Sequence, residues 1–380
     1  MTENAKQRLA LSLYFLLSGF CFATWASRIP TIKMLYDFNE AELGNLLLVL
    51  PISSLVGLPI SGWLVSKFDS RTPLIVSFIV FSFALALIGY SSSVLLLVVA
   101  VFLFSFCMRI LNISMNTQSI TLQKNFLRKI IGSFHGIWST GGILGVGFST
   151  LMVKIDVSMK HHLLIVGIFS LIVSLIAYPF LLKNDKSPHG NKLIIGKPDK
   201  LIMLLGFLVF FAAVCEGGMF DWSGVYFKEV IKEDLFTIGY LTFMVFMALS
   251  RFSIDFLIDK IGMQHMYVIS STLVTIGIST AIIFPYFWPA LIGFGIVGIG
   301  VAAIFPMTFM LAGTSKKYSA GIALSIVTTY GIVGMLVGPP LIGYIAHAFN
   351  LKVSFVLFIL AGLMLIPISR LFFKYKNEEA

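Results

Sequence analysis

The feature that most constrains this sequence is a succession of long apolar runs, separated by short polar stretches, along almost the whole chain. Each run is close to the length of about 20 residues that an α-helix needs to cross a bilayer. Backbone groups in lipid must bond within their own segment, and the runs do not alternate as barrel strands do, so helices are predicted. Twelve runs are found, at residues 9–30, 41–65, 73–91, 94–118, 130–153, 162–182, 200–227, 236–258, 265–284, 287–312, 320–347 and 351–373.

The composition excludes an ordinary soluble domain. Of the 380 residues, 58% are hydrophobic and 12% are charged, whereas a soluble domain has about 45–50% apolar and about 25% charged residues. Twelve spans use roughly 240 residues, which leaves only short connections. The first apolar run, Leu9 to Ala26, exceeds the 7–15 residues that are about the length of a signal-peptide core, so we expect a retained first helix.

The net charge of +10 is explained by membrane orientation, and no nucleic-acid partner is expected. With the N-terminus inside, most of the 27 Lys and Arg residues fall on inner segments, as the positive-inside rule requires. The sequence therefore predicts a multi-pass protein of the plasma (inner) membrane with both termini cytoplasmic. The predicted outer loops carry only Lys33, Lys154, Lys160, Lys228, Lys232 and Lys352.

A polar stretch and an internal repeat divide the chain in two. The longest polar stretch, residues 183–199, contains Pro and Gly and separates six runs from six. We predict an N-terminal six-helix bundle over residues 1–182, a cytoplasmic linker over 183–199 and a C-terminal bundle over 200–380. Adding 193 to a first-half position gives its repeat equivalent. The matched pairs are Gly141 with Gly334, Gly145 with Gly338, Lys67 with Lys260, and Arg28 with Asp221.

The segment from Gly62 to Arg71 resembles the loop 2–3 signature of the major facilitator superfamily, G-x-L-x-D-R-x-G-R-R. Ser66 replaces the usual aspartate and Asp69 the usual glycine, and a relic of the motif runs from Asp255 to Gly262. The resemblance implies an all-α fold of twelve transmembrane helices in two pseudo-symmetric six-helix bundles. It also implies gating roles for Lys67, Asp69 and Arg71.

Three further segments resemble the MosC-like subgroup of that superfamily. They are Ser114–Gln118, His135–Gly142 and Glu216–Tyr226. The subgroup implies a solute transporter, and its named member is linked to an inositol-derived compound. Most substrates of the subgroup are unassigned, so no substrate is carried over.

Ionisable groups within the membrane cost about 2.5–3.5 kcal/mol on insertion scales and usually face a cavity or a partner. Glu216, past the middle of the seventh run, is the leading candidate for both substrate binding and proton coupling. The alternative is a carboxyl group held by a neighbouring hydroxyl. Asp221 is a second proton-coupling candidate, and we hypothesise that it pairs with Arg28 when an outer gate is shut. Both could instead extend to water at the interface.

Polar faces on two other runs could contact a solute. Arg109, Asn112 and Asn116 share one face of the fourth run. The two amides could bind sugar-like hydroxyls or hold helices together, and Arg109 is expected to need a carboxylate partner. His135 and Trp138 share a face of the fifth run and could bind the solute, line a gate or belong to the core.

The remaining candidates have a structural role or a structural alternative to a functional one. Trp222 is a substrate-binding candidate, although it and Tyr226 also fit an interfacial aromatic belt. Arg251, Asp255 and Asp259 are spaced for a charge ladder that holds an inner gate. Glycines at 295, 298 and 300 favour helix packing over nucleotide binding. Cys21, Cys107 and Cys215 indicate no metal or disulfide, and His161 with His162, placed in an outer loop, gives only a weak metal hypothesis.

The sequence favours a secondary active transporter that moves a sugar, polyol or derivative by alternating access, coupled to protons and acting as a monomer without a cofactor. A drug–proton antiporter of the same superfamily is the alternative, although Gly141 to Gly145 lacks the proline of the usual antiporter motif. A nontransporting receptor is a further alternative. The sequence motifs of metal-dependent or serine-based enzymes are not found in it, so no enzyme is expected.

Overall fold

The computed structural model describes residues 2–127, 130–183, 199–251, 253–315, 317–318 and 320–378, and within these ranges it contains helices and no strand. Most of the predicted linker therefore lies outside the described residues. The helices are α1 (Glu3–Ser27), α2 (Ile29–Leu35), α3 (Glu40–Phe68), α4 (Arg71–Tyr90), α5 (Val94–Gln123), α6 (Ile131–Lys154), α7 (Met159–Ala177), η1 (Tyr178–Phe180), α8 (Lys200–Glu229), α9 (Thr237–Arg251), α10 (Ile254–Ile261), α11 (Met263–Ile283), α12 (Phe287–Ala302), α13 (Ile304–Gly313), α14 (Ala320–Ala348), α15 (Leu351–Ser354) and α16 (Val356–Glu378).

The all-α membrane fold is confirmed. Among the described residues, eleven helical segments are long and apolar enough to cross a bilayer, and the shorter apolar helix α9 lies at the eighth predicted run. That run, residues 236–258, was predicted as one helix, but α9 ends at Arg251 and α10 begins at Ile254. The tenth run is likewise divided into α12 and α13.

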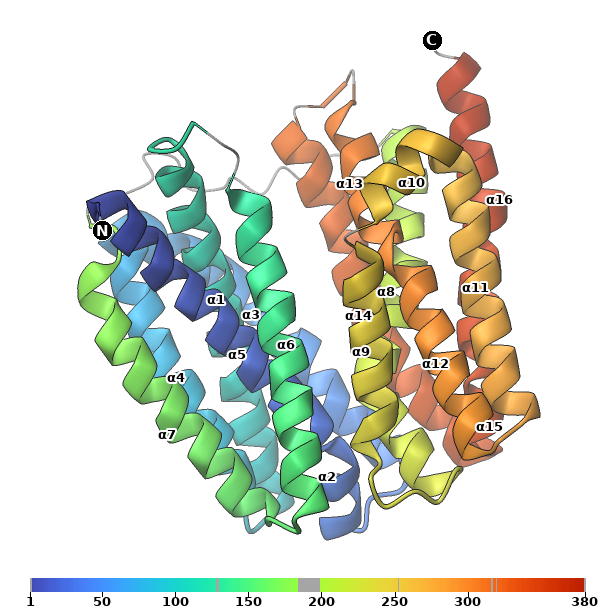
Figure 1. Cartoon of the computed structure of the whole chain (residues 1–380), viewed down its shortest axis with the longest axis horizontal. Coiled ribbons are helices and arrows are strands. Elements are labelled where there is room, and N and C mark those ends of the chain that lie inside the picture. The colour runs from blue at the N-terminus through green and yellow to red at the C-terminus, as the bar shows by residue number, and fades with distance from the viewer. Residues whose placement is uncertain are drawn as a thin grey trace. The chain divides into compact units, whose positions relative to one another are not determined.

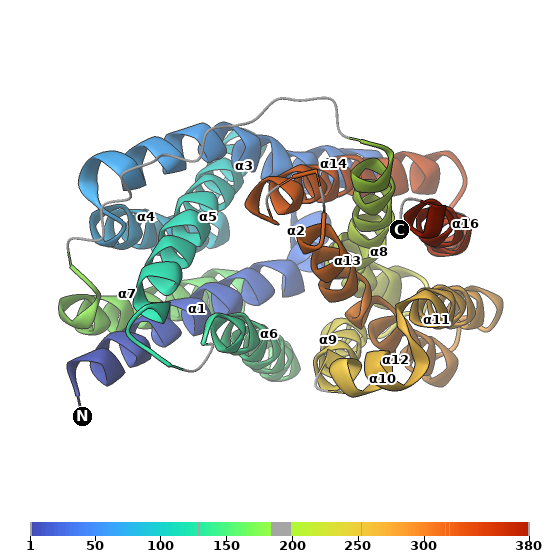
Figure 2. The same cartoon turned by 90° about the horizontal axis from the view of Figure 1, so that it is seen from above.

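The chain forms two compact units, each built from helices packed side by side. The first comprises the described parts of Met1–Thr31 and Val49–Leu193, and the second those of Ile32–Leu48 and Ile194–Ala380. Within the first, α1 packs on α6 and α7, and α4 packs on α5 and α7 (Figures 1 and 2). Within the second, α8 packs on α14 and α16, and α11 packs on α12 and α16. The sequence boundaries at 182 and 200 stay a prediction.

Glycines set the close packing of equivalent helix pairs in the two units. A Cβ added at Gly141 of α6 would collide with the backbone carbonyl of Leu16 in α1. At the repeat-equivalent Gly334 of α14, it would collide with the carbonyl of Phe210 in α8. Small residues allow helix backbones to approach closely in a membrane. The same pairing in both units agrees with the predicted repeat.

The repeat also preserves a backbone turn. Asp69, between α3 and α4, has φ 92°, and Gly262, between α10 and α11, has φ 83°. The two positions differ by the repeat offset, 262 − 69 = 193. Positive φ favours glycine, which explains why the superfamily signature usually has glycine where this chain has Asp69. The Asp69 carboxylate accepts a hydrogen bond from the Thr72 backbone N–H at 2.9 Å.

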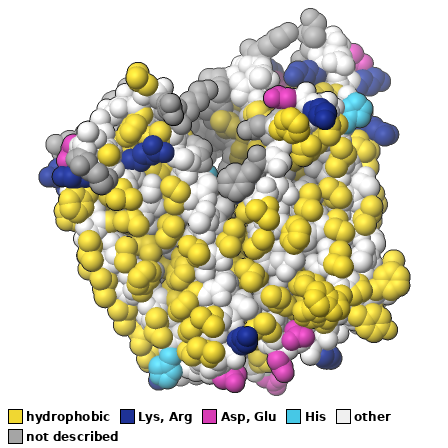
Figure 3. Space-filling model, viewed as in Figure 1, with side chains coloured by type: hydrophobic (Ala, Val, Ile, Leu, Met, Phe, Trp, Pro, Cys, Tyr) yellow, Lys and Arg dark blue, Asp and Glu magenta, His cyan; other side chains and the backbone are white. Residues whose placement is uncertain are grey.

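Apolar and charged side chains are distributed as a bilayer requires. On the face shown in Figure 3, hydrophobic side chains cover the middle of the helices, and charged side chains lie mostly toward the helix ends. Large exposed apolar residues such as Phe83 and Ile176 project outward. An exposed apolar surface of this kind suits contact with lipid rather than water.

Candidate functional site

A buried ion pair joins two helices of the second unit. Glu216 lies near the middle of α8 and is 8% exposed. Its Oε1 accepts a hydrogen bond from Nη2 of Arg251, the last residue of α9, at 3.2 Å. The other oxygen, Oε2, is buried without a hydrogen-bond partner among the described residues. Glu216 is therefore held by an arginine, rather than by a hydroxyl group as considered from the sequence.

Asp221 lies five residues further along α8 and is also 8% exposed. Among the described residues it has no hydrogen bond and no ion pair. The two acidic groups of α8 thus have different surroundings.

Arg28 is held by neutral groups of the first unit. It caps α1 and is 4% exposed. Its Nε donates to Nδ1 of His162 at 2.9 Å, and its Nη2 donates to the Val157 carbonyl at 2.8 Å. His162 lies in the first turn of α7 and is fully buried, so its predicted place in a loop was wrong. The pairing of Arg28 with Asp221 in a shut outer gate stays a prediction.

The predicted polar face of α5 contains a half-buried arginine. Arg109 Nε donates to the Ser54 hydroxyl of α3 at 2.7 Å. The expected carboxylate partner is not found among the described residues. Asn116 Nδ2 donates to the backbone carbonyl of Asn112 in its own helix at 2.8 Å. The side-chain amide of Asn112 forms no hydrogen bond in the described part of the chain.

The aromatic candidates differ in exposure. His135 is exposed beside Phe15, with ring centroids 5.7 Å apart, and Trp138 is half-buried beside Phe22. Trp222 and Tyr226 are fully buried, so the interpretation as an aromatic belt was wrong. Tyr226 donates its hydroxyl to the Ala281 carbonyl at 2.8 Å. The substrate-binding roles of His135, Trp138 and Trp222 stay predictions.

The predicted inner-gate residues lie at helix ends. Lys67 Nζ lies 4.7 Å from the centroid of the Trp63 ring, and the guanidinium of Arg71 lies 4.2 Å from that of Tyr178. Arg251 and Asp259 are on separate helices, because the break between α9 and α10 interrupts the single helix that the predicted charge ladder needs. Asp259 is exposed, and the side chain of Asp255 lies outside the described residues.

Sequence reasoning missed a polar cluster at the predicted outer end of the second unit, formed by Lys33, Glu40, Glu229 and His347. We call it the outer polar cluster. Lys33 Nζ bonds to Glu229 Oε1 at 2.5 Å and to Glu40 Oε1 at 3.2 Å, and His347 Nδ1 lies 3.9 Å from Glu40 Oε2. A signal for this cluster was present in the sequence, because its charged residues lie at the ends of apolar runs on the predicted outer side of the membrane.

The outer polar cluster ties the segment Ile32–Leu48 to α8 and α14. Glu229 is on α8 and His347 on α14. The Tyr344 hydroxyl of α14 donates to the Asn45 side chain of α3 at 2.7 Å. A Cβ at Gly343 would collide with the Glu40 carbonyl, so the backbones also approach closely.

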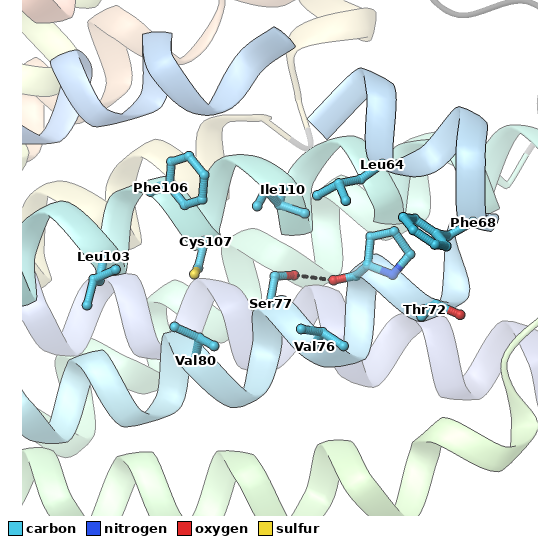
Figure 4. Close-up of a pocket in the computed structure, with 11 residues that line it drawn as sticks. Leu64, Phe68, Thr72, Val76, Ser77, Val80, Leu103, Phe106, Cys107 and Ile110 are labelled. Carbon is cyan, nitrogen blue, oxygen red and sulfur yellow. Dashed lines mark hydrogen bonds between the residues drawn. The ribbon is translucent and has the colours of Figure 1, made fainter. Parts of the chain in front are cut away.

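A pocket of about 390 Å³ lies among α3, α4 and α5 of the first unit (Figure 4). It is lined by apolar side chains, and the hydroxyl of its Ser77 is already bonded to the Pro73 carbonyl at 2.6 Å. None of the predicted site residues lines it. Its lining residues are Leu64, Phe68, Thr72, Pro73, Val76, Ser77, Val80, Leu103, Phe106, Cys107 and Ile110.

The cysteines, the possible metal ligands and the glycine-rich run were the remaining features considered in the sequence. The three cysteines are free and buried. In the described part of the chain, His, Cys, Asp and Glu do not form a group of three that could hold a metal. Helix packing by the glycine-rich run is confirmed, because a Cβ at Gly298 would collide with the Phe243 carbonyl and one at Gly300 would crowd the Ser270 carbonyl.

The sequence matches the model of the Major Facilitator Superfamily over residues 11–266 and 240–380. Membrane protein MosC of Rhizobium meliloti is 32% identical over 373 residues, covering 97% of this chain and 91% of that protein. An uncharacterized MFS-type transporter of Yersinia pestis is 30% identical over 351 residues, covering 92% and 91%.

Solved structures show the same fold. A form of the nucleoside transporter NupG superposes with a TM-score of 0.78 at 14% identity, covering 97% of this chain and 100% of that chain. A bacterial homologue of the human lysosomal transporter Spinster gives 0.78 at 14% identity, covering 96% of both. The chain therefore belongs to the major facilitator superfamily and is a multi-pass MFS-type transporter that resembles MosC.

Proposed function

We propose that this transporter moves a small polar solute, a sugar, polyol or derivative, across the plasma membrane by proton-coupled alternating access. The observation that carries the proposal is Asp221, a carboxyl group buried within a membrane-spanning helix without a partner among the described residues. An intramembrane carboxyl group of this kind marks an ion or proton path. It can bind a proton on one side of the membrane and release it on the other.

Glu216 has a second role in this proposal. Its Oε1 is held by Arg251, and its Oε2, which has no hydrogen-bond partner among the described residues, is the acceptor that we propose for a hydroxyl group of the solute. The free amide of Asn112 supplies a donor and an acceptor of its own. A donor and an acceptor on one amide suit the hydroxyl groups of a polyhydroxylated solute.

Alternating access requires contacts that break when the outer side opens. The outer polar cluster supports this, because α1 belongs to the first unit while the segment Ile32–Leu48 that follows it is fastened to α8 and α14. The ion pairs of the outer polar cluster hold this segment on the second unit. We propose that its ion pairs close the outer side, that both termini are cytoplasmic, and that the transporter acts as a monomer.

The proposal is tested with the purified protein in liposomes. A thermal-shift screen of sugars, polyols, amino acids, nucleosides and cationic drugs first identifies a solute, because a ligand of the folded state raises its stability. Uptake of that solute is then measured with and without an imposed pH gradient. We expect gradient-driven accumulation by the unsubstituted chain. Asp221→Asn should abolish accumulation but retain exchange of labelled for unlabelled solute.

Two results would contradict the proposal. Accumulation by Asp221→Asn equal to that of the unsubstituted chain would remove Asp221 from proton coupling. Stabilisation by lipophilic cations alone, with export driven by the pH gradient, would favour the drug–proton antiporter.

A further inference from the structure

Arg109 combines a central position in a membrane-spanning helix with unused hydrogen-bonding capacity. It lies halfway along α5, which spans Val94–Gln123. A guanidinium group has five N–H donors. The Nε–H donates to Ser54, and in the described part of the chain neither Nη1 nor Nη2 forms a hydrogen bond or ion pair.

The contacts of Arg109 hold its side chain in place. Gly57 of α3 lies against it, since a Cβ at Gly57 would be 3.2 Å from the Arg109 Cβ. The Ser105 hydroxyl, four residues earlier on α5, donates to the Leu50 carbonyl of α3 at 2.6 Å. The stem is therefore packed against α3 and the Nε is fixed, while both terminal nitrogens are left available.

The face of α5 that carries Arg109 is not the face that borders the apolar pocket. Arg109, Asn112 and Asn116 recur at helical spacing on one side, whereas Leu103, Cys107 and Ile110 line the pocket on another. A charged group directed into lipid would be strongly unfavourable. The face of Arg109 and Asn112 is therefore expected to border a water-filled path.

The positive charge of Arg109 has no acidic counterpart in the described part of the first unit. The ion pairs found there and in the second unit do not include Arg109 or Arg28. Arginine stays protonated in proteins, so the charge cannot be removed by deprotonation. A cation in this position needs an anion, and a guanidinium binds carboxylate and phosphate groups with two parallel hydrogen bonds.

We infer that the solute carries a negatively charged group, a carboxylate or a phosphate, and that the free Nη1 and Nη2 of Arg109 bind it while the Asn112 amide contacts a neighbouring hydroxyl. This inference rests on the proposed function, because it names the class of solute that the transporter would accept. Sugar acids and polyol phosphates fit the description. Neutral sugars would leave the guanidinium without a counterion.

The charge at Arg109 is tested first without knowing the solute. Asn112→Cys, one helical turn from Arg109, is reacted with two methanethiosulfonate reagents of similar size, one with a sulfonate and one with a trimethylammonium group. The unsubstituted chain, with its three buried cysteines, gives the background. The sulfonate should react faster, and adding Arg109→Gln should lower the ratio of the two rates by about tenfold.

Two variants control this measurement. Arg109→Lys keeps the charge and should keep most of the ratio. Lys154→Gln removes an exposed positive charge of the same unit and should leave it unchanged. A ratio that Arg109→Gln does not alter would show that a carboxylate of the protein neutralises the arginine. Failure of both reagents to react would show that no water-filled path reaches this face. Either result would overturn the inference.

The class of solute is tested next by thermal shift with matched pairs, glucuronate with glucose and inositol phosphate with inositol. We expect the acidic member to stabilise the protein, Arg109→Gln to abolish the effect, and Arg109→Lys to retain part of it. Equal stabilisation by both members, unchanged in Arg109→Gln, would refute the inference and leave polar-solute transport standing. No effect of either acid would also refute it. Stabilisation only by lipophilic cations would contradict the proposed function itself.

Discussion

A carboxylate and a guanidinium that are buried together each replace part of the water that the other has lost. In the ion pair of Glu216 and Arg251, the side chains are 11% and 29% exposed. Removing Arg251 leaves the Glu216 carboxylate buried without this ion pair, whereas replacing both members leaves no charge there. The pair therefore stabilises the contact between α8 and α9 mainly by avoiding an isolated charge.

Arg251→Gln should lower the free energy of unfolding by about 3 kcal/mol, the lower part of the range for breaking a buried pair. Adding Glu216→Gln should restore a large part of that loss, because the isolated carboxylate is then gone. Thermal unfolding of both single variants and the double variant in detergent measures the coupling. Additive losses in the double variant would show that the two side chains are not energetically coupled.

The sequence predicted which single residues are costly in a membrane, but not what they contact. Glu216, Asp221, Arg28 and Arg109 were recognised because a charged residue within an apolar run is visible in the sequence alone. Arg251 as the partner of Glu216 was not, because 35 positions separate them. Spacing rules describe neighbours on one helix, and the tertiary partner depends on packing.

At the scale of helices, glycine positions decide how closely two backbones approach. In α6, a Cβ at Gly145 would collide with the Phe20 carbonyl of α1, whereas a Cβ at Gly147 would meet nothing within 4 Å. The two glycines are two positions apart on one helix and differ only in what they face. Substituting each of them therefore distinguishes the effect of glycine on helix packing from its unfavourable helix propensity.

Gly145→Ala should destabilise the protein by about 1–3 kcal/mol, because the collision with backbone cannot be relieved by a rotamer change. Gly147→Ala should instead stabilise it slightly, by about 0.5–1 kcal/mol, since alanine is the better helix former. Chemical unfolding of the two variants gives the comparison. The same sign for both would show that helix propensity, and not contact with α1, governs these positions.

The turn between α3 and α4 gives a second test at this scale. Asp69 combines an unfavourable positive φ with a favourable hydrogen bond to the Thr72 N–H. Asp69→Gly removes about 1 kcal/mol of backbone strain and loses about as much in capping, so little net change is expected. Asp69→Ala keeps the strain and loses the cap, so a loss of about 1 kcal/mol is expected. Melting temperatures measure both, and equal values would contradict this account.

The helical class and the order of the helices followed from hydropathy, because in lipid every apolar run must become a helix. The break in the tenth run has a local signal, because Pro306, the third residue of α13, lacks the N–H that would bond to the Ala302 carbonyl in a continuous helix. The break in the eighth run did not follow, because no proline or glycine lies near Arg251 at the end of α9. That break depends on the helices packed around it, which one sequence does not describe.

At the scale of the whole molecule, transport by alternating access depends on contacts that are strong enough to close one side and weak enough to open again. The outer polar cluster meets this requirement, because its side chains are between 11% and 56% exposed. Ion pairs in such positions contribute about 0–1 kcal/mol each. A network of this strength can bias an equilibrium between two states without locking it.

Lys33→Gln should therefore raise the population in which the segment Ile32–Leu48 is released by about fivefold, which corresponds to about 1 kcal/mol. Amide hydrogen exchange reports this population directly, because released backbone amides exchange faster. The increase should be confined to Ile32–Leu48 and to the end of α14 around Tyr344, which bonds to Asn45.

Lys228→Gln is the matched control for this last prediction. It removes the nearby ion pair of Lys228 with Asp234, which joins α8 to the loop that follows it and does not reach Ile32–Leu48. Its effect on exchange should stay within that loop. If Lys228→Gln released Ile32–Leu48 as much as Lys33→Gln did, the loss of any positive charge at the predicted outer end of the second unit would be sufficient to release this segment. The outer polar cluster would then have no specific part in closing the outer side.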